Sequence, residues 1–234
     1  MFRHSQRFYD LVYGFKDYPA EARRLAELVD ERLPGARSLL DVACGTGKHL
    51  AELSQRIPDA EGLDLDEGLL AIARERLPGT TFHLGDMTGF ELGRRFDVVT
   101  CLFSSIGYAT TEEGLRAAIA AMASHLEPGG VLLVEPWLEP DVWKPGHLHL
   151  LTVDEPDVKL SRATIAGLEG TVSIMDFHYL VVTNDGVEHF TEHHVAGLYT
   201  RAQMVGAFEA AGLGVEHDEE GLTGRGLYIG TKPG

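Results

Sequence analysis

Three acidic residues and a glycine turn stand where predicted strands end, and together they could hold a small cationic ligand. The stretch "DVACGTGKHL" (41–50) places Asp41 before a Gly-Thr-Gly turn that leads into a predicted helix. Gly45 and Gly47 would let the backbone approach a ligand closely and adopt angles that other residues resist. Doubly wound folds bind ligands where strands turn into helices, so this turn is a candidate cofactor site.

A dinucleotide-binding fingerprint, G-x-G-x-x-G, is one interpretation of this turn. That motif needs a small third residue where helix and strand meet, and it presents the helix N-terminus to a pyrophosphate. Here the third position is Leu50, and Asp41 suits a cationic ligand better than an anionic phosphate. A nicotinamide-dependent dehydrogenase is therefore the weakest of the functions considered.

Two further carboxylates end later predicted strands. Asp64 ends the strand in "AEGLDLD" (60–66), and Asp86 ends the strand in "TTFHLGD" (80–86). Asp64 is well placed to accept hydrogen bonds from ribose hydroxyls, and Asp86 from an adenine amino group while Met87 packs on the ring. Each acid alone could equally be a helix cap or a solvated group. Taken in strand order with the glycine turn, they indicate a ligand that carries an amino group, a ribose and an adenine.

Alternating β and α elements would bring these strand ends together. Strands are predicted at 37–43, 60–66, 80–86, 96–103 and 131–137, with helices between them. This alternation predicts a parallel, doubly wound α/β sheet with right-handed crossovers. After Trp137, four stretches alternate apolar and polar residues, which predicts antiparallel strands with a three-residue hairpin loop near 184–186. A helix capped by Thr200 and a closing strand pair complete the predicted single domain.

Composition limits the function classes. The chain has 234 residues, 44% of them apolar, and no apolar run or leader pattern that would predict a membrane span or secretion. Cys44 and Cys101 are the only cysteines, which argues against a disulfide framework and favours a cytoplasmic enzyme. The net charge of −16, with no Lys/Arg stripe, argues against nucleic acid as a partner. It also opposes an anionic substrate unless a local basic pocket overrides it.

The successive motifs "DVACGTG", "GLDLD", "GDM" and "LEPGG" resemble those of the class I S-adenosylmethionine-dependent methyltransferases. The resemblance implies a Rossmann-like sheet of seven strands whose last strand is antiparallel. It also implies contacts to S-adenosylmethionine, or to its product S-adenosylhomocysteine. Asp41 and the 43–47 backbone (Ala43, Gly45, Gly47) would face the methionine part, Asp64 the ribose, and Asp86 with Met87 the adenine. The further cofactor contacts implied are Leu65 and Phe103.

A closer resemblance lies in "SLLDVACGTGKHL", "LFSSIGY", "LEPGGVLLVEPW", "DFHYLVV" and "GRGLYIG", which are similar to the aminosugar N,N-dimethyltransferases. Those enzymes act on dTDP-linked deoxyaminosugars. The resemblance implies a homodimer through the antiparallel layer and a helical lid in which Tyr9 and Tyr18 close over the cofactor. The expected division is an N-terminal lid (1–36), a cofactor-binding core (37–137), an antiparallel substrate and dimer insert (138–199), and a closing helix with strands (200–234).

Methyl transfer to an amine is an in-line displacement that needs orientation and a base more than covalent help. Tyr108 follows the fourth strand and matches a tyrosine or histidine position of the resembled enzymes, so it can orient the amine or accept its proton; core packing is the alternative. His178 and His194 match histidines of those enzymes, and we expect both to contact substrate, with His178 also a catalytic candidate. A metal site among the insert histidines lacks partner carboxylates or cysteines at ligand spacing, and no metal is expected.

A diphosphate needs an arginine or lysine in a suitable geometry. Arg225, between two glycines, is the best candidate, ahead of Lys144, Arg162 and Arg201. Ser105 and Trp137 are expected beside the sugar or the thymine. The leading hypothesis is N,N-dimethylation of a dTDP-linked aminosugar. The alternatives are methylation of another small molecule and a catalytically silent protein that only binds S-adenosylmethionine.

Overall fold

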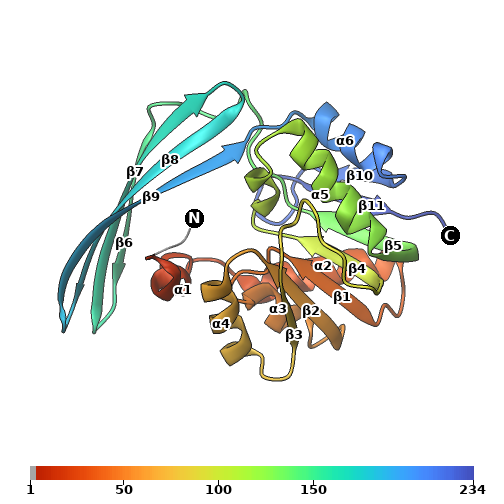
Figure 1. Cartoon of the computed structure of the whole chain (residues 1–234), viewed down its shortest axis with the longest axis horizontal. Coiled ribbons are helices and arrows are strands. Elements are labelled where there is room, and N and C mark those ends of the chain that lie inside the picture. Colours follow the sequence, from red (N-terminus) through yellow and green to blue (C-terminus); the bar gives the residue numbers. More distant parts are fainter. Residues whose placement is uncertain (1–3) are drawn as a thin grey trace.

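A seven-stranded sheet with the order β10-β11-β5-β4-β1-β2-β3 forms the centre of the computed structural model, which describes residues 4–234 (Figure 1). β11 runs antiparallel to both of its neighbours, β10 and β5, whereas β1 to β5 pair in parallel. The predicted doubly wound sheet with an antiparallel last strand is therefore confirmed. The strands are β1 (Ser38–Val42), β2 (Asp59–Asp64), β3 (Thr81–Leu84), β4 (Phe96–Cys101), β5 (Leu126–Val134), β10 (Gly214–Asp218) and β11 (Leu227–Thr231).

Helices cover both faces of this sheet, which explains why its strands read as continuous apolar runs. Leu39 and Val98 pack in one apolar cluster with helices α2 (Tyr18–Arg32) and α3 (Lys48–Leu53). Their neighbours Leu40 and Val99 point the other way, into a cluster with α5 (Glu112–Ser124) and α6 (Arg201–Ala210). α4 (Glu67–Arg76) follows β2 and begins at Asp66, whose side chain accepts from the Gly68 and Leu69 amides.

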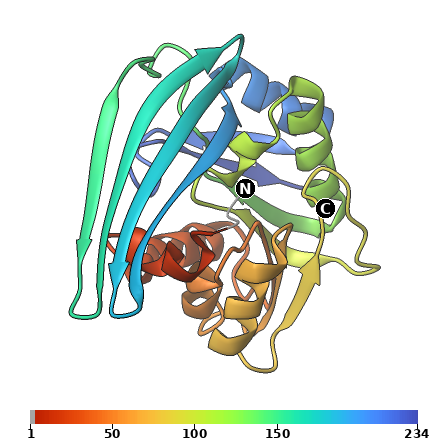
Figure 2. The same ribbon diagram turned by 60° about the vertical axis from the view of Figure 1, so that its left-hand side comes forward.

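A second sheet of four antiparallel strands stands beside this body, in the order β6-β7-β8-β9 (Figure 2). Its strands are β6 (Leu148–Asp154), β7 (Val158–Glu169), β8 (Val172–Thr183) and β9 (Gly186–Gly197). This confirms the predicted antiparallel layer after Trp137. Thr183 pairs directly with Gly186, so the hairpin loop between β8 and β9 has two residues rather than the predicted three.

The N-terminal segment lies between the two sheets (Figures 1 and 2). It consists of η1 (Gln6–Phe8) and α1 (Tyr9–Val12), and Phe8 and Val12 pack against the antiparallel sheet in one apolar cluster. On its other side Asp10 accepts a hydrogen bond from Thr46 Oγ1 at 2.7 Å and pairs with Arg76. α2 instead belongs to the core, so only the first part of the expected 1–36 lid lies over the space between the sheets; residues 1–3 fall outside the described part of the chain.

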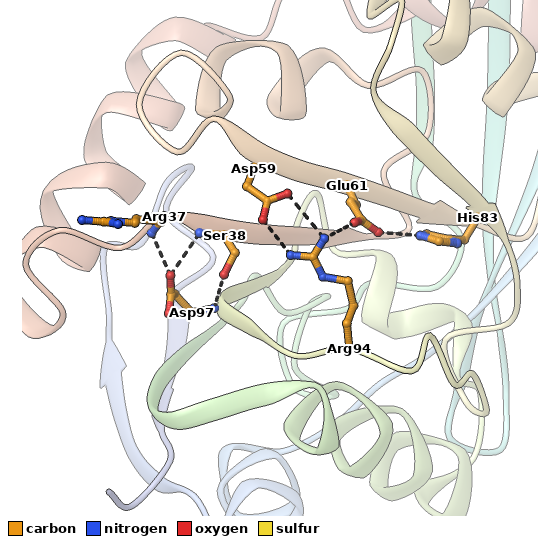
Figure 3. A network of polar contacts seen from close by, with 7 residues as sticks. All are labelled: Arg37, Ser38, Asp59, Glu61, His83, Arg94 and Asp97. Atoms are coloured by element: carbon orange, nitrogen blue, oxygen red, sulfur yellow. Dashed lines mark hydrogen bonds and ion pairs between the residues drawn. The ribbon is translucent and has the colours of Figure 1, made fainter.

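Polar contacts at the amino ends of the parallel strands serve the fold (Figure 3). Asp97 accepts from the backbone amides of Arg37 and Ser38 at 2.8 and 3.0 Å, which ties β4 to β1. Arg94 joins Asp59 and Glu61 of β2, and Glu61 also pairs with His83 of β3 at 2.6 Å. This cluster lies at the edge of the sheet opposite to the carboxyl ends of the strands. Within residues 4–234 no helix combines the length and the apolar character that a membrane span requires.

Candidate active site

A cavity of about 1100 Å³ lies between the carboxyl ends of the parallel strands and the inner face of the antiparallel sheet. We use "inner face" for the side of that sheet that carries Phe177 and Tyr179 and packs on α1. Side chains that follow each of the first five strands line the cavity, as do parts of α1 and of β6 to β9. The lining includes Tyr9, Ala43, Gly45, Asp64, Leu65, Asp86, Met87, Phe103, Ser105, Tyr108, Trp137 and Arg225.

Backbone strain is concentrated at this cavity. Ala43, Phe103 and Ser104 are the non-glycine residues of the described chain with positive φ, at 58°, 52° and 61°. All three line the cavity. Such conformations each cost of order 1–3 kcal/mol and persist where the surroundings impose them, typically at functional sites. The strain therefore indicates that the loops after β1 and β4 belong to a functional site.

Asp64 links the glycine turn to the end of β2. The residue is 8% exposed, and its carboxylate accepts from the backbone amides of Gly45 and Asp66, both at 2.8 Å. Burial raises the pKa of Asp64, and these amide hydrogen bonds oppose that rise. The neighbouring Leu65 is 60% exposed within the cavity wall, which is unusual for a large apolar side chain. A carboxylate beside an uncovered apolar surface is suited to a ribose that leads to an aromatic base.

The Asp86 and Met87 pair lies at the neighbouring strand end, after β3. The Asp86 carboxylate accepts from the Thr88 amide and hydroxyl at 2.8 and 2.7 Å, which fixes the loop. Met87 lines the cavity and packs on the core behind it. The structure thus brings together four of the residues expected at the ribose and adenine: Asp64, Leu65, Asp86 and Met87.

Three residues expected at the cofactor do not line the cavity. Asp41 lies beneath the glycine turn, where its buried carboxylate accepts from Thr100 Oγ1 at 2.7 Å and burial raises its pKa to about 6. Gly47 begins α3 with φ of 75°, and a Cβ there would lie 3.3 Å from the Ala73 side chain, so this glycine serves helix packing. Tyr18 begins α2 and packs its ring against His49, with the ring centroids 4.7 Å apart. For these three the structure corrects the expectation of direct contact.

Tyr108 lines the cavity, and His194 lies directly behind it. The Tyr108 hydroxyl is 3.0 Å from His194 Nδ1, and burial raises the pKa of Tyr108 far above its ordinary value. His194 is 1% exposed and is not among the lining residues. The structure thus corrects the expectation that His194 contacts substrate, because Tyr108 stands between the imidazole and the cavity.

The structure also corrects the expectation for His178. Side chains alternate along a strand, so Phe177 and Tyr179 point to the inner face and His178 points to the opposite, outer face. There His178 is exposed and its ring lies 6.3 Å from that of His189. Within one chain, His178 therefore has access neither to the cavity nor to Tyr108.

Cations at the cavity offset the negative charge of the chain locally. Arg225 donates from Nη1 to Ser104 Oγ at 2.9 Å, and its guanidinium lies 5.2 Å from the centroid of the Trp137 ring. Both flanking glycines have positive φ, 79° at Gly224 and 84° at Gly226, so the loop that presents Arg225 depends on them. Lys144 and Arg162 also line the cavity, whereas Arg201 lies outside it and pairs with Glu219.

Sequence reasoning missed two contributors to this site. Tyr13 lines the cavity, and its hydroxyl accepts from Arg162 Nη1 at 3.1 Å. Glu192, 3.6 Å from His194 Nε2, is buried on the inner face. A signal for Glu192 was present, since it shares the phase of Phe190 and Ala196 along its strand.

Comparison with known proteins links this cavity to a reaction class. Residues 39–130 match the family model described as a methyltransferase domain. The chain is 46% identical, over 95% of its length and 95% of the relative's, to dTDP-3-amino-3,4,6-trideoxy-alpha-D-glucopyranose N,N-dimethyltransferase of Streptomyces venezuelae.

Solved structures of methyltransferases also match the chain over nearly its whole length. The crystal structure of Streptomyces venezuelae DesVI matches with a TM-score of 0.91 at 46% identity and covers 97% of each chain. The structure of S-adenosylmethionine-bound CalS10, an amino pentose methyltransferase from Micromonospora echinaspora, matches with a TM-score of 0.88 at 39% identity and covers 99% of this chain and 98% of that one.

Proposed function

This chain belongs to the family of the dTDP-aminosugar N,N-dimethyltransferases, whose methyl donor is S-adenosylmethionine, and we propose that it dimethylates the amino group of a dTDP-linked deoxyaminosugar. One observation carries the proposal. A single cavity is lined by strand-end residues suited to an adenosine (Asp64, Leu65, Asp86), by a half-buried tyrosine (Tyr108) and by a guanidinium (Arg225). Donor, amine and diphosphate each have a matching group there.

The residues after β1, β2 and β3 fit the donor. The space beside Gly45 is open on the cavity side. The nearest atom to a Cβ placed there would be the Tyr9 hydroxyl, 4.0 Å away. We propose that Asp64 accepts from the ribose hydroxyls and that Leu65 and Met87 cover the adenine. Asp41 acts on this site through the turn that it underlies. When bound, S-adenosylmethionine supplies an electrophilic methyl group on its sulfonium.

The protein's part in the reaction is to orient the amine. The nitrogen lone pair must point along the C–S bond at about 3 Å, and such orientation supplies most of the acceleration expected here. Tyr108 stands after β4 with its hydroxyl held by His194, so it can accept a hydrogen bond from the amine without rotating away. The raised pKa of Tyr108 keeps its phenol neutral at pH 7.

Arg225 is proposed to bind the diphosphate. Its guanidinium is held between Ser104 and the face of Trp137, an arrangement that leaves other N–H groups of the fork for phosphate oxygens. Lys144 lies at the same cavity and adds positive charge. Short-range attraction of this kind overcomes the repulsion of a chain with a net charge of −16, because distant surface charges are screened by salt.

Incubation with isotope-labelled S-adenosylmethionine and a panel of dTDP-3-amino and dTDP-4-amino deoxysugars tests the proposal. We expect one sugar in the panel to gain two labelled methyl groups, detected by mass spectrometry. Free aminosugars without the nucleotide serve as the control and should react poorly. If none of the nucleotide-linked sugars gains a methyl group, the substrate assignment fails, and methylation of another small molecule or silent cofactor binding takes its place.

We further propose that the enzyme is a cytoplasmic homodimer. Its antiparallel sheet leaves the large apolar side chains Leu148, Leu180 and Val187 exposed on the outer face, and exposed apolar surface of this kind supports an interface. Cys44 and Cys101 are buried free thiols, as expected for a reducing compartment. Sedimentation analysis should give twice the chain mass, and Leu180→Glu should shift the species toward the single-chain mass. A wild-type protein that sediments as a monomer at all concentrations would exclude the dimer.

A further inference from the structure

Three side chains, one half-buried at the cavity and two buried behind it, form a path that leads from the cavity to the N-terminal segment. Tyr108 comes from the short helix η2 (Ser105–Tyr108), and His194 and Glu192 come from β9. The Tyr108 hydroxyl is 3.0 Å from His194 Nδ1, and His194 Nε2 is 3.6 Å from Glu192 Oε2. His194 and Glu192 are both on the inner face and are buried. A hydroxyl, an imidazole and a carboxylate in this order resemble the arrangement that activates hydroxyl groups in hydrolases.

The N-terminal segment fixes the Glu192 carboxylate. Oε1 accepts from the backbone amides of His4 and Ser5, both at 3.1 Å, and Oε2 accepts from Ser5 Oγ at 2.7 Å. Burial alone would raise the pKa of Glu192, but the adjacent His194 imidazole and hydrogen bonds from Ser5 and the His4 amide outweigh burial and lower it to about 2. Glu192 is thus an anion whenever this segment is seated against the antiparallel sheet.

The charge of Glu192 determines the protonation pattern of His194. An ionised carboxylate can only accept, so the Nε2 that faces Glu192 carries the hydrogen. The other nitrogen, Nδ1, is then left as the acceptor that faces the Tyr108 hydroxyl. This tautomer is the one that can receive a proton from Tyr108.

We propose that His194 and Glu192 are positioning residues through which Tyr108 removes a proton from the substrate ammonium; the inference rests on the proposed methylation of an amine. The ammonium N–H bond breaks and its proton moves to Tyr108 Oη, while the Tyr108 hydroxyl proton moves to His194 Nδ1. The products are a neutral amine, a neutral tyrosine and an imidazolium beside Glu192. A neutral lone pair is then available for the methyl group. Before the second methylation the imidazolium releases its proton to solvent, and the neutral His194 can then take part in the same transfer from the methylated ammonium.

The surroundings of His194 show why Glu192 is needed. The Phe177 ring of β8 lies 4.7 Å from the imidazole, measured between ring centroids. The Arg162 guanidinium of β7 lies 4.5 Å from the centroid of the same Phe177 ring. Arg162 in turn binds the neutral phenol of Tyr13, and Tyr179 of β8 adds a second neutral phenol nearby. Among these neighbours Arg162 is the cation and Glu192 is the anion, and the Glu192 carboxylate is the one that faces His194 Nε2 at 3.6 Å.

The pH dependence of kcat separates this role from a merely structural one. We expect His194→Gln to lower kcat about tenfold near pH 7, because the amide can hold the Tyr108 hydroxyl but cannot take up its proton. The deficit should disappear near pH 9.5, where a larger fraction of the substrate amine is neutral without help. Tyr108→Phe should show the same convergence with the wild type. The double variant should be no slower than Tyr108→Phe alone, because both residues act in one path.

Controls keep the test independent of folding and of the substrate assignment. Binding of S-adenosylhomocysteine, measured by calorimetry, should be unchanged in each variant. His83→Gln removes a histidine from another His–Glu pair, at the far edge of the sheet, and should leave kcat unchanged at every pH (Figure 3). A deficit in His194→Gln that stays constant with pH, or additive losses in the double variant, would overturn the relay. If instead the wild type methylates none of the sugars, the proposed function is what fails.

Discussion

Replacement of Asp64 with alanine should weaken the binding of S-adenosylhomocysteine by about 2–3 kcal/mol, a rise in Kd of roughly 30- to 150-fold. Two effects combine in this loss. The carboxylate is buried at the cavity, where hydrogen bonds to an ionised group are strong, and it also holds the Gly45 amide at 2.8 Å. Without it, both the proposed ribose contact and the conformation of the glycine turn are lost. Isothermal titration calorimetry measures the change directly.

A second substitution at the same position separates these two effects. Asp64→Asn keeps an oxygen that can accept from the Gly45 amide but removes the charge, so we expect an intermediate loss of affinity. Asp59→Asn, at the opposite end of the same strand, is the matched control and should leave the Kd unchanged (Figure 3). NADH should not compete with S-adenosylhomocysteine in the wild type. An unchanged Kd in Asp64→Ala would remove Asp64 from the cofactor site.

The strand-end residues of this site were predictable because they follow from local patterns. In a parallel sheet every strand delivers its carboxyl end to the same edge, so an acid that ends a strand is placed by the strand itself. Asp64 and Asp86 are predicted at the cavity on this ground alone, and the structure finds both in its wall. The parallel strands of the sheet followed from the same alternation, and the seven strands with an antiparallel β11 followed from the family resemblance.

Asp41, Gly47 and Tyr18 could not be placed in the same way, because their positions depend on packing between distant elements. Position 47 is a glycine because α4 packs closely against it. The distance between α4 and the turn cannot be predicted from the sequence of the turn alone. Tyr18 is the first residue of α2, directly after the N-cap residue Asp17. The direction in which α2 runs places the Tyr18 ring against His49. Such contacts are set by tertiary structure and not by the local sequence pattern.

For His178 and His194, the sequence contained part of the information needed to place the side chains. Phe177, Tyr179 and Val181 form the apolar phase of β8, so the intervening His178 belongs to the other face. That phase was readable from the alternation "DFHYLVV". The link from Ser5 to Glu192 spans 187 residues and joins two elements that no local pattern connects. Only the folded chain reveals that the N-terminal segment holds Glu192 beside His194.

Arg225 is the residue whose removal should affect substrate binding most. Arg225→Ala should raise KM for a dTDP-aminosugar by roughly 10- to 100-fold, because hydrogen bonds to a charged partner contribute about 1.5–3 kcal/mol. Affinity for S-adenosylhomocysteine should not change, since the guanidinium lies at Ser104 and Trp137, away from the strand ends that carry Asp64 and Asp86. Steady-state kinetics and calorimetry on the same preparation measure the two quantities.

The geometry of the fork distinguishes a diphosphate site from a general attraction of anions. Arg225→Lys keeps the charge but loses the planar pair of donors and the contact with Ser104, so it should recover only part of the affinity. Arg201→Ala removes one positive charge outside the cavity, where Arg201 pairs with Glu219, and should leave KM unchanged. Binding of dTDP without a sugar should weaken in Arg225→Ala as much as binding of the complete substrate. If dTDP binds the alanine variant as tightly as the wild type, the diphosphate lies elsewhere in the cavity, and Lys144 and Arg162 are the cations that remain to hold it.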